Sequence, residues 1–305
     1  MKPIRSGEFY AVSAALLWGL NYVIVKMVLG EMAEGQFLPI RFLCTAAFLA
    51  LYLRLRGEDF TVRKEHLLPV ALLGVVGVGL YNIIWTYGIH LTTAANAALL
   101  ISTSPIFTGI YTAALQKEPL PPLKWCGIIL AFLGIFLLVR QTEGAAIRLD
   151  SGYFLGNLLV LAGALLFSLY GVIAKPLLHC YSPVKLTTLA MLGSLVILIP
   201  FGLIQCPVSQ WSGIAPAMGA KLAYVVGCGT ILAFTFWYEG IKYTGPLKTV
   251  LFHYLVPVTS ILLSPLLLGE NFNAGQIIGA ALVLAGLLIS NSDFPKCFHR
   301  NHLIS

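Results

Sequence analysis

The chain has 305 residues, of which 58% are hydrophobic and 10% are charged, and its formal net charge is +7. A soluble domain usually carries about 25% charged residues, so this composition excludes an ordinary soluble protein. The positive charge would suit a nucleic-acid-binding protein, but its basic residues are distributed as membrane-topology signals, so we expect no nucleic-acid partner.

Ten apolar runs are long enough to cross a bilayer, which takes roughly 20 residues each. They cover residues 9–29, 36–53, 67–87, 93–115, 121–139, 153–174, 184–204, 220–241, 247–268 and 274–291. The first run is too long for the apolar part of a signal peptide, so we interpret it as a span. The sequence therefore predicts an all-α, multi-pass protein with ten transmembrane helices, located in the cell membrane (the bacterial inner membrane).

The distribution of Lys and Arg predicts the orientation of these spans. With a cytoplasmic N-terminus, 14 of the 19 basic residues lie in cytoplasmic segments. Only Arg140, Arg148 and Lys221 then lie in outside loops. Because cytoplasmic loops normally carry the excess of Lys and Arg, we expect both termini in the cytoplasm.

The first span has a copy in the sixth, since a shift of 149 positions places Trp18 on Phe167 and Lys26 on Lys175. Later spans match at a shift of 152. This shift pairs Trp85 with Trp237, Gly88 with Gly240, Thr92 with Thr244, Pro105 with Pro257, Glu118 with Glu270, Gly127 with Gly279 and Gly134 with Gly286. The chain is therefore interpreted as a duplication, with five-helix repeats at 1–145 and 146–305. An odd number of spans inverts the second repeat, as in many secondary transporters.

These residues resemble the EamA-type branch of the drug/metabolite transporter superfamily. The resemblance covers nearly the whole chain. It is carried by ALLWGLNYVIVK in the first span, by Arg41 in PIRF and by LLGENFNAGQIIGAALVLAGLL near the end. The first repeat departs from the last motif, because Lys117 stands where the second repeat has Gly269. The resemblance implies ten helices, a central cavity, alternating access, and export or exchange of small metabolites.

We therefore predict a secondary active transporter, with export of amino acids or related compounds as the favoured activity. The alternatives are a multidrug or organic-cation efflux carrier, a channel and an intramembrane enzyme. A channel usually shows charge rings or filter loops, and an enzyme would need acidic or His residues clustered at depth. Neither pattern is visible, so we expect no enzymatic activity, catalytic residue, cofactor or metal.

Two prolines lie in the middle of spans, Pro105 in the fourth and Pro257 in the ninth. Each removes a backbone donor and frees the carbonyl four residues earlier, which bends a helix. The bends are either static kinks or hinges. We expect them to meet across a central cavity, with hydroxyl groups on one side and the His253–Tyr254 pair on the other.

Polar side chains inside the membrane should face the bundle interior, because burial in hydrocarbon is costly. His253 suits packing, substrate binding or proton binding, and Glu239 either pairs with Lys242 near the membrane surface or couples protons. The complete set of substrate-cavity candidates is Trp18, Asn21, Tyr22, Tyr81, Asn82, Trp85, Ser102, Pro105, Tyr170, Trp237, Glu239, His253, Tyr254 and Pro257. Contacts between helices are the alternative role for each.

Arg41 is expected to form a structural salt bridge with Glu31 or Glu34 at the outer start of the second span. Lys26 either extends toward the membrane surface or offers a cation to an anionic substrate group. Glycines in the fifth and tenth spans allow close helix packing. Packing within the chain explains these glycines, and pairing in a homodimer, which the resemblance allows, would explain them equally well. The expected partners are a small-molecule substrate and the lipid bilayer. The resemblance also allows a second copy of the chain as a partner.

Overall fold

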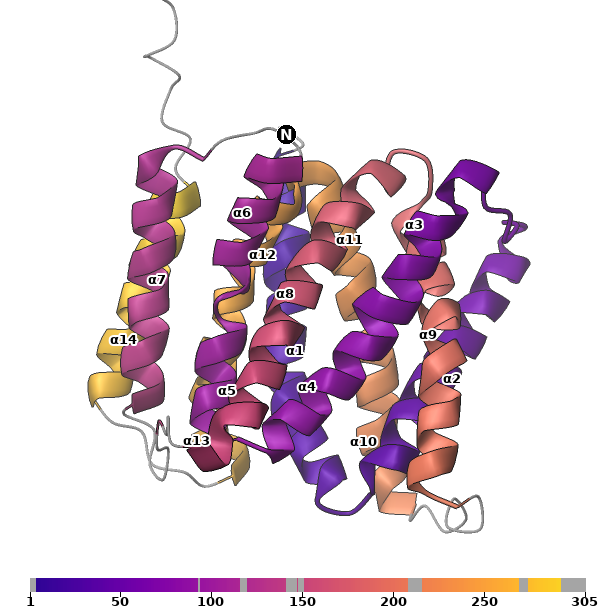
Figure 1. Cartoon of the computed structure of the whole chain (residues 1–305), viewed down its shortest axis with the longest axis horizontal. Coiled ribbons are helices and arrows are strands. Elements are labelled where there is room, and N and C mark those ends of the chain that lie inside the picture. Colours follow the sequence, from indigo (N-terminus) through magenta and orange to yellow (C-terminus); the bar gives the residue numbers. More distant parts are fainter. Residues whose placement is uncertain are drawn as a thin grey trace, which may run out of the picture.

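The computed structural model describes residues 4–92, 94–115, 120–140, 147, 151–207, 216–268 and 274–291. These residues are nearly all helical and include no strand, so the predicted all-α fold is confirmed (Figure 1). The paired residues Glu118 and Glu270, and the departure at Lys117 and Gly269, lie outside them.

The first half of the chain contains five helical stretches. They are α1 (Ile4–Leu29); α2 (Glu34–Leu55); η1 (Lys64–His66), α3 (Leu67–Leu72), η2 (Leu73–Leu80) and α4 (Tyr81–His90) in one stretch; α5 (Ala94–Ile101) with α6 (Ser104–Leu115); and α7 (Pro122–Arg140). The second half repeats this order after the short turn η3 (Ser151–Tyr153). Its stretches are α8 (Phe154–Leu177); α9 (Pro183–Gln205); α10 (Pro216–Val226), η5 (Gly227–Leu232) and α11 (Ala233–Thr244) in one stretch; α12 (Pro246–Leu251), η6 (Phe252–Tyr254) and α13 (Leu255–Leu268); and α14 (Ala274–Asn291).

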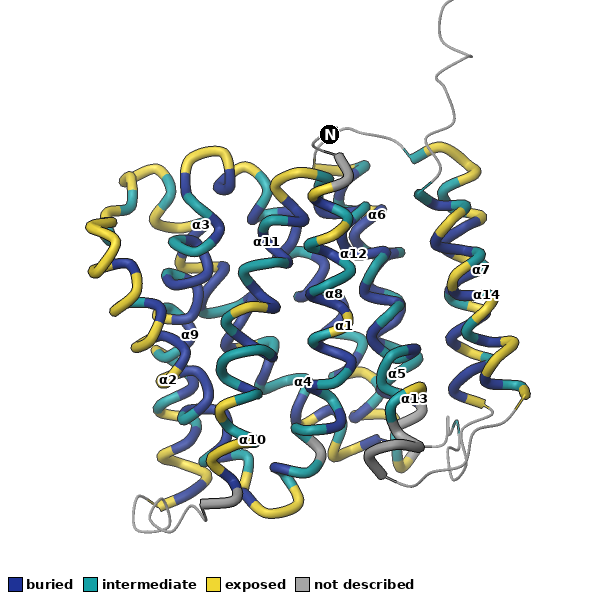
Figure 2. Tube along the Cα trace, turned by 180° about the vertical axis from the view of Figure 1, so that it is seen from behind, coloured by how far each residue is buried: buried dark blue, intermediate teal, exposed yellow. Residues whose placement is uncertain are grey.

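Within the described residues, nine helices are long and apolar enough to cross a membrane. The remaining predicted span, 247–268, is the broken stretch α12, η6 and α13. Large apolar side chains are exposed along the outer helices, as a lipid-facing surface requires (Figure 2). The chain is thus a multi-pass membrane protein.

Both mid-span prolines stand at breaks between helices rather than at bends within one helix. Pro105 is the second residue of α6, which begins after α5 ends at Ile101. Pro257 is the third residue of α13, which follows the 3-10 turn η6. Proline fits the first turn of a helix because the amides there have no partner within the helix. The Ile101 carbonyl, predicted to be freed by Pro105, accepts a hydrogen bond from Ser104 Oγ at 2.6 Å.

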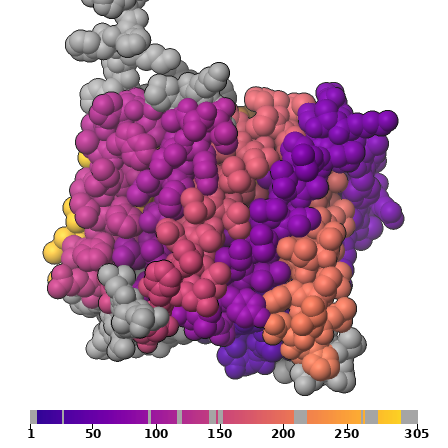
Figure 3. Space-filling view, in the orientation of Figure 1, coloured from indigo at the N-terminus to yellow at the C-terminus, as the bar shows by residue number. Residues whose placement is uncertain are grey.

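The two halves are interleaved. The first helix of one half, α1, packs against α11 and α13 of the other, and the first helix of the second half, α8, packs against α4 and α6. Figure 3 shows the same mixing on the surface, where the pink α8 lies between the magenta helices and the purple α3 and α4 of the first half. Two further contacts join equivalent helices, α2 with α9 and α7 with α14.

Glycines let the antiparallel helices α7 and α14 touch through their backbones. A Cβ atom on Gly127 would lie 2.5 Å from the Ser290 amide nitrogen, and one on Gly286 would lie 2.4 Å from the Ala131 amide nitrogen. These distances are too short for any side chain, so only glycine permits this packing. Contacts within the chain therefore account for the glycine spacing of the fifth and tenth spans.

The face on which α1 begins, called here the N-terminal face, is tied across the two halves by polar contacts (top of Figure 1). Lys185 Nζ donates to Asp59 Oδ1 at 2.6 Å, and the Arg63 amide donates to Tyr181 Oη at 3.0 Å. Glu8 and Lys248 form an ion pair at 2.7 Å between α1 and α12. Each contact joins a residue of the first half to one of the second.

The Asp59 contact should make stability depend on pH. The hydrogen bond from Lys185, with a further one from Thr61, lowers the pKa of Asp59 from 3.8 to about 2. A carboxylate with a depressed pKa stabilises the fold above its unfolded pKa, and this contribution is lost as pH falls through the folded pKa. We expect the melting temperatures of wild type and Asp59→Asn to differ slightly above pH 4 and to converge between pH 4 and pH 2. The effect is small because the Asp59 side chain is 72% exposed, so solvent screens its charge. A difference in melting temperature between the two proteins that stays constant from pH 4 to pH 2 would contradict this role of Asp59.

Candidate functional site

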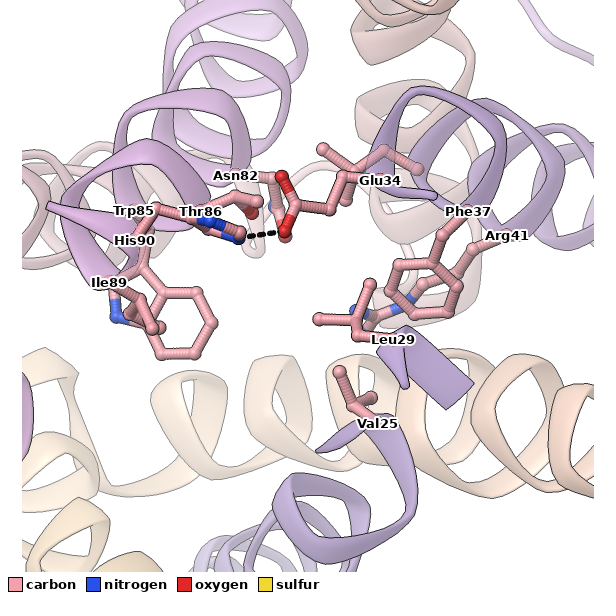
Figure 4. Close-up of a pocket in the computed structure, with 11 residues that line it drawn as sticks. Val25, Leu29, Glu34, Phe37, Arg41, Asn82, Trp85, Thr86, Ile89 and His90 are labelled. Carbon is pink, nitrogen blue, oxygen red and sulfur yellow. Dashed lines mark hydrogen bonds and ion pairs between the residues drawn. The ribbon is translucent and has the colours of Figure 1, made fainter. Parts of the chain in front are cut away.

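A cavity of about 50 Å³ lies in the half of the molecule away from the N-terminal face, which is room for only a few water molecules. The end of α1, the start of α2 and the end of α4 form its walls (Figure 4). The lining residues are Val25, Leu29, Glu34, Phe37, Leu38, Arg41, Asn82, Trp85, Thr86, Ile89 and His90. The lining is therefore largely apolar, with a few polar groups that could orient a ligand.

Arg41 reaches this cavity from α2 and is 8% exposed. Its Nε donates a hydrogen bond to Thr230 Oγ1 at 2.8 Å, and Thr230 Oγ1 donates to the Val225 carbonyl at 2.7 Å. Thr230 belongs to the π-helical segment η5, whose counterpart in the first half is the π-helical segment η2. Such segments are rare and are frequent at functional sites.

The acidic residues around Arg41 bind other partners, so the predicted salt bridge of Arg41 is wrong. The Glu34 carboxylate bonds to His90 Nε2, which joins the start of α2 to the end of α4 (dashed line in Figure 4). Glu31 pairs with Lys221 at 2.5 Å. The side chain of Lys26 lies outside the described residues.

Four of the predicted cavity residues are packed in a buried aromatic cluster instead of lining this cavity. Trp18 lies 4.9 Å from Trp237 and 5.9 Å from His253, measured between ring centroids. Phe167 lies 4.9 Å from His253 and stacks on Tyr170 at 6.5 Å. Trp18 Nε1 also donates to the Gly229 carbonyl of η5 at 3.1 Å.

A second group of predicted residues lies at or beside the cavity. Asn82 and Trp85 line it, and Tyr22 meets the Trp85 ring edge-on at 5.3 Å. Trp85 Nε1 is buried without a hydrogen-bond partner among the described residues, as is Asn21 Oδ1, which lies against Gly229. Tyr81 packs on Phe167 at 5.6 Å and so connects the cavity wall with the aromatic cluster. The structure thus brings Asn82, Trp85 and Tyr22 together.

The residues at the helix breaks are placed elsewhere. Ser102 Oγ donates to the Ala98 carbonyl at 2.7 Å, and Tyr254 Oη donates to the Ile128 carbonyl of α7 at 3.4 Å. Pro105 and Pro257 begin α6 and α13, and neither they nor His253 line the cavity described here. The two breaks therefore do not meet across this cavity.

Pairing with Lys242 was one of the two roles considered for Glu239, and the two side chains interact electrostatically without forming a close ion pair. The Glu239 Oε2 atom is buried and has no hydrogen-bond partner among the described residues. Lys242 Nζ instead lies 5.9 Å from the centroid of the Tyr243 ring. Glu239 lies on α11 and is not a lining residue of the cavity.

Four charged, titratable or aromatic lining residues were not among the predicted candidates: Glu34, Phe37, Arg41 and His90. The signal that could have identified Arg41 is its position, because a charged residue well inside a span is a functional candidate by default. The described residues hold no group of three or more His, Cys, Asp or Glu side chains placed to bind a metal ion.

Comparison with known proteins places the chain among membrane transporters. The family model described as "EamA-like transporter family" matches residues 5–140 and 154–292. The uncharacterized transporter YyaM of Bacillus subtilis is 26% identical over 280 residues, which cover 91% of this chain and 90% of the relative. The uncharacterized inner membrane transporter YicL of Salmonella typhimurium is 24% identical over 298 residues, which cover 96% of this chain and 97% of the relative.

Another relative carries a more specific name. The probable amino-acid metabolite efflux pump of Salmonella typhimurium is 25% identical over 303 residues, covering 95% of this chain and 96% of the relative. A solved crystal structure that is 20% identical superposes with a TM-score of 0.81 over 94% of this chain and 96% of that one. This likeness shows the shared fold.

Proposed function

Because this chain belongs to the EamA-like transporter family, we propose that it is a secondary active transporter that moves small metabolites by alternating access. The interleaving of two equivalent halves supports this mechanism, with α1 against α11 and α13, and α8 against α4 and α6. A site between two inverted repeats can be exposed to either side of the membrane when one set of helices rocks against the other. The repeats are assigned to 1–145 and 146–305.

The orientation follows from the basic residues. Most of the Lys and Arg residues in the described part of the chain lie at the N-terminal face, and we place this face in the cytoplasm together with both termini. The cavity of Arg41 then lies in the outer half of the membrane. Its volume of about 50 Å³ is below the roughly 300–1,000 Å³ of typical ligand pockets, so its walls would have to move apart to admit a metabolite.

The proposed substrates are amino acids or related compounds, and the proposed direction is export from the cytoplasm. The similarity to a probable amino-acid metabolite efflux pump supports this class. A multidrug or organic-cation carrier is the alternative. Arg41 disfavours it, because its positive charge borders the cavity while the Glu34 carboxylate in the same wall bonds to His90.

Counterflow in proteoliposomes tests this function. Vesicles that contain the protein and an unlabelled amino acid should accumulate the same labelled amino acid faster than protein-free vesicles. The accumulation should decay as the internal pool is diluted. A steady passive current, or a lack of counterflow with amino acids when organic cations do exchange, would refute the proposal.

Glu239→Gln should leave this exchange intact, with or without a pH gradient, because Glu239 is not a lining residue of the cavity. The measurement compares initial counterflow rates of wild type and variant at equal protein density in the vesicles. Loss of pH-driven accumulation in the variant alone would show that Glu239 couples proton movement to transport.

A further inference from the structure

The charge of Arg41 has no carboxylate partner in the described part of the chain. Arg41 lies about two helical turns inside α2 and is 8% exposed. Burial of a guanidinium group is costly unless an anion pairs with it. The side-chain hydrogen bond of Arg41, from Nε to Thr230 Oγ1, goes to a neutral group, and the nearby carboxylates of Glu31 and Glu34 bind Lys221 and His90.

The guanidinium group borders the cavity beside aromatic rings. Its central carbon lies 5.8 Å from the Phe37 ring centroid and 5.2 Å from that of Phe42. Figure 4 shows Arg41 and Phe37 on one side of the enclosed space and Trp85 on the other. The hydrogen bond to Thr230 holds Nε, while Nη1 and Nη2 make no hydrogen bond with the described residues. These two groups can bind an anion through paired hydrogen bonds.

The equivalent position in the second half carries no charge. Arg41 is the eighth residue of α2, and Ala190 is the eighth residue of α9. Both positions adjoin a π-helical segment. Arg41 bonds Thr230 of η5, and the Ala190 carbonyl would lie 2.9 Å from a Cβ on Gly74 of η2. The shared scaffold therefore needs no cation here, so the charge of Arg41 serves a purpose that the second half lacks.

We propose that Arg41 binds the carboxylate group of the transported substrate, while Phe37, Trp85 and the neighbouring apolar side chains contact its organic part. This assignment rests on the proposed transport function and narrows its substrate class to small monocarboxylates, amino acids included. One guanidinium group balances a singly charged carboxylate. It would leave a phosphate dianion, whose charge is about −2, half uncompensated.

The test measures ligand binding by thermal shift with the purified full-length protein, independently of transport. The probes are the common amino acids, simple monocarboxylates such as 3-methylbutanoate, the corresponding carboxamides, and inorganic phosphate. Wild type should be stabilised by at least one carboxylate. The matching carboxamide should bind at least about tenfold more weakly, because it loses a charge-assisted pair of hydrogen bonds.

Variants assign the effect to Arg41. Arg41→Gln should lose the preference for acid over amide. Arg54→Gln removes the same charge from an exposed position in the last turn of α2 and should keep it. Arg41→Lys should keep the preference with weaker binding, because a Lys ammonium cannot make the paired contact. Arg41→Lys therefore tests the role of Arg41 even if Arg41→Gln does not fold.

Several results would overturn the inference: no carboxylate stabilises wild type, acid and amide bind equally, phosphate alone binds, or both Arg41 variants bind carboxylates as wild type does. Counterflow separates this failure from a failure of the proposed function. If the protein exchanges amino acids but its Arg41 variants still bind the acid better than the amide, only the role of Arg41 is refuted. If carboxylate binding depends on Arg41 but no counterflow is observed, only the proposed transport function is refuted.

Discussion

Replacement of Trp18 by Ala should lower the free energy of unfolding by about 3–5 kcal/mol, the range for removal of a buried Phe or Trp side chain. The Trp18 ring is 7% exposed and contacts the rings of Phe234 and Trp237 at 5.3 and 4.9 Å. The change also leaves the Gly229 carbonyl without the hydrogen bond from Trp18 Nε1. Thermal or denaturant unfolding of the purified protein in detergent measures the loss.

Phe9→Ala is the matched control for this change. Phe9 lies on the same helix, α1, but is 65% exposed, so its removal should have little effect on stability in detergent. Trp18→Phe should fall between the two, because it keeps a ring and loses the hydrogen bond. Equal stability of Trp18→Ala and Phe9→Ala would show that Trp18 does not belong to the packed core and would return it to the substrate-binding candidates.

Gly286→Ala should destabilise the protein by roughly 1–3 kcal/mol through overpacking. The added methyl group would lie 2.4 Å from the Ala131 amide nitrogen and 2.6 Å from the Gly127 carbonyl oxygen. Both contacts are to backbone atoms, so α7 and α14 must move apart as whole helices. The loss is measured as a drop in the thermal unfolding midpoint of the purified protein.

Ala281→Val serves as the control on α14, because it adds more volume at an exposed position of the same helix. It should leave the unfolding midpoint close to that of wild type. If Gly286→Ala were as stable as Ala281→Val, the close approach of the two helices would not contribute to the stability of the fold.

The positions of the spans could be predicted from the sequence because the bilayer sets their length and hydropathy. The predicted span 36–53 corresponds to α2 (Glu34–Leu55), and the predicted span 184–204 corresponds to α9 (Pro183–Gln205). The prolines also located the irregular places in two spans. They could not distinguish a bend from a break, because the outcome depends on local groups such as Ser104, whose hydroxyl satisfies the Ile101 carbonyl.

The partners of polar residues could not be predicted in the same way. Hydropathy gives the depth of a residue in the membrane. It does not give the side of the helix on which it lies, since lipid-facing and buried sides are both apolar. Arg41, Glu31 and Glu34 lie close together in the sequence around the start of the second span and were expected to pair. In the structure Glu31 instead binds Lys221, 190 positions away, and Arg41 binds Thr230 of the second half.

The aromatic candidates show a related limit. A large ring suits both the wall of a binding site and the interior of a bundle. Trp85 and Trp237 are equivalent in the duplication, yet Trp85 lines the cavity and Trp237 is 2% exposed in the aromatic cluster. The same residue type therefore has different surroundings in the two repeats. A comparison of the two sequences alone cannot show this difference.

The antiparallel pairing of α7 and α14 has a consequence for biosynthesis. The side of α7 that carries Gly127 and Gly134 enters the membrane long before α14, the helix that packs against these glycines, has been made. At about 5–20 residues per second, α14 leaves the ribosome roughly 8–30 s after α7. During that time α7 contacts lipid or the insertion machinery. Final assembly of the bundle must therefore wait until α14 has been made, and a chain that stops before Ala274 leaves α7 without this partner.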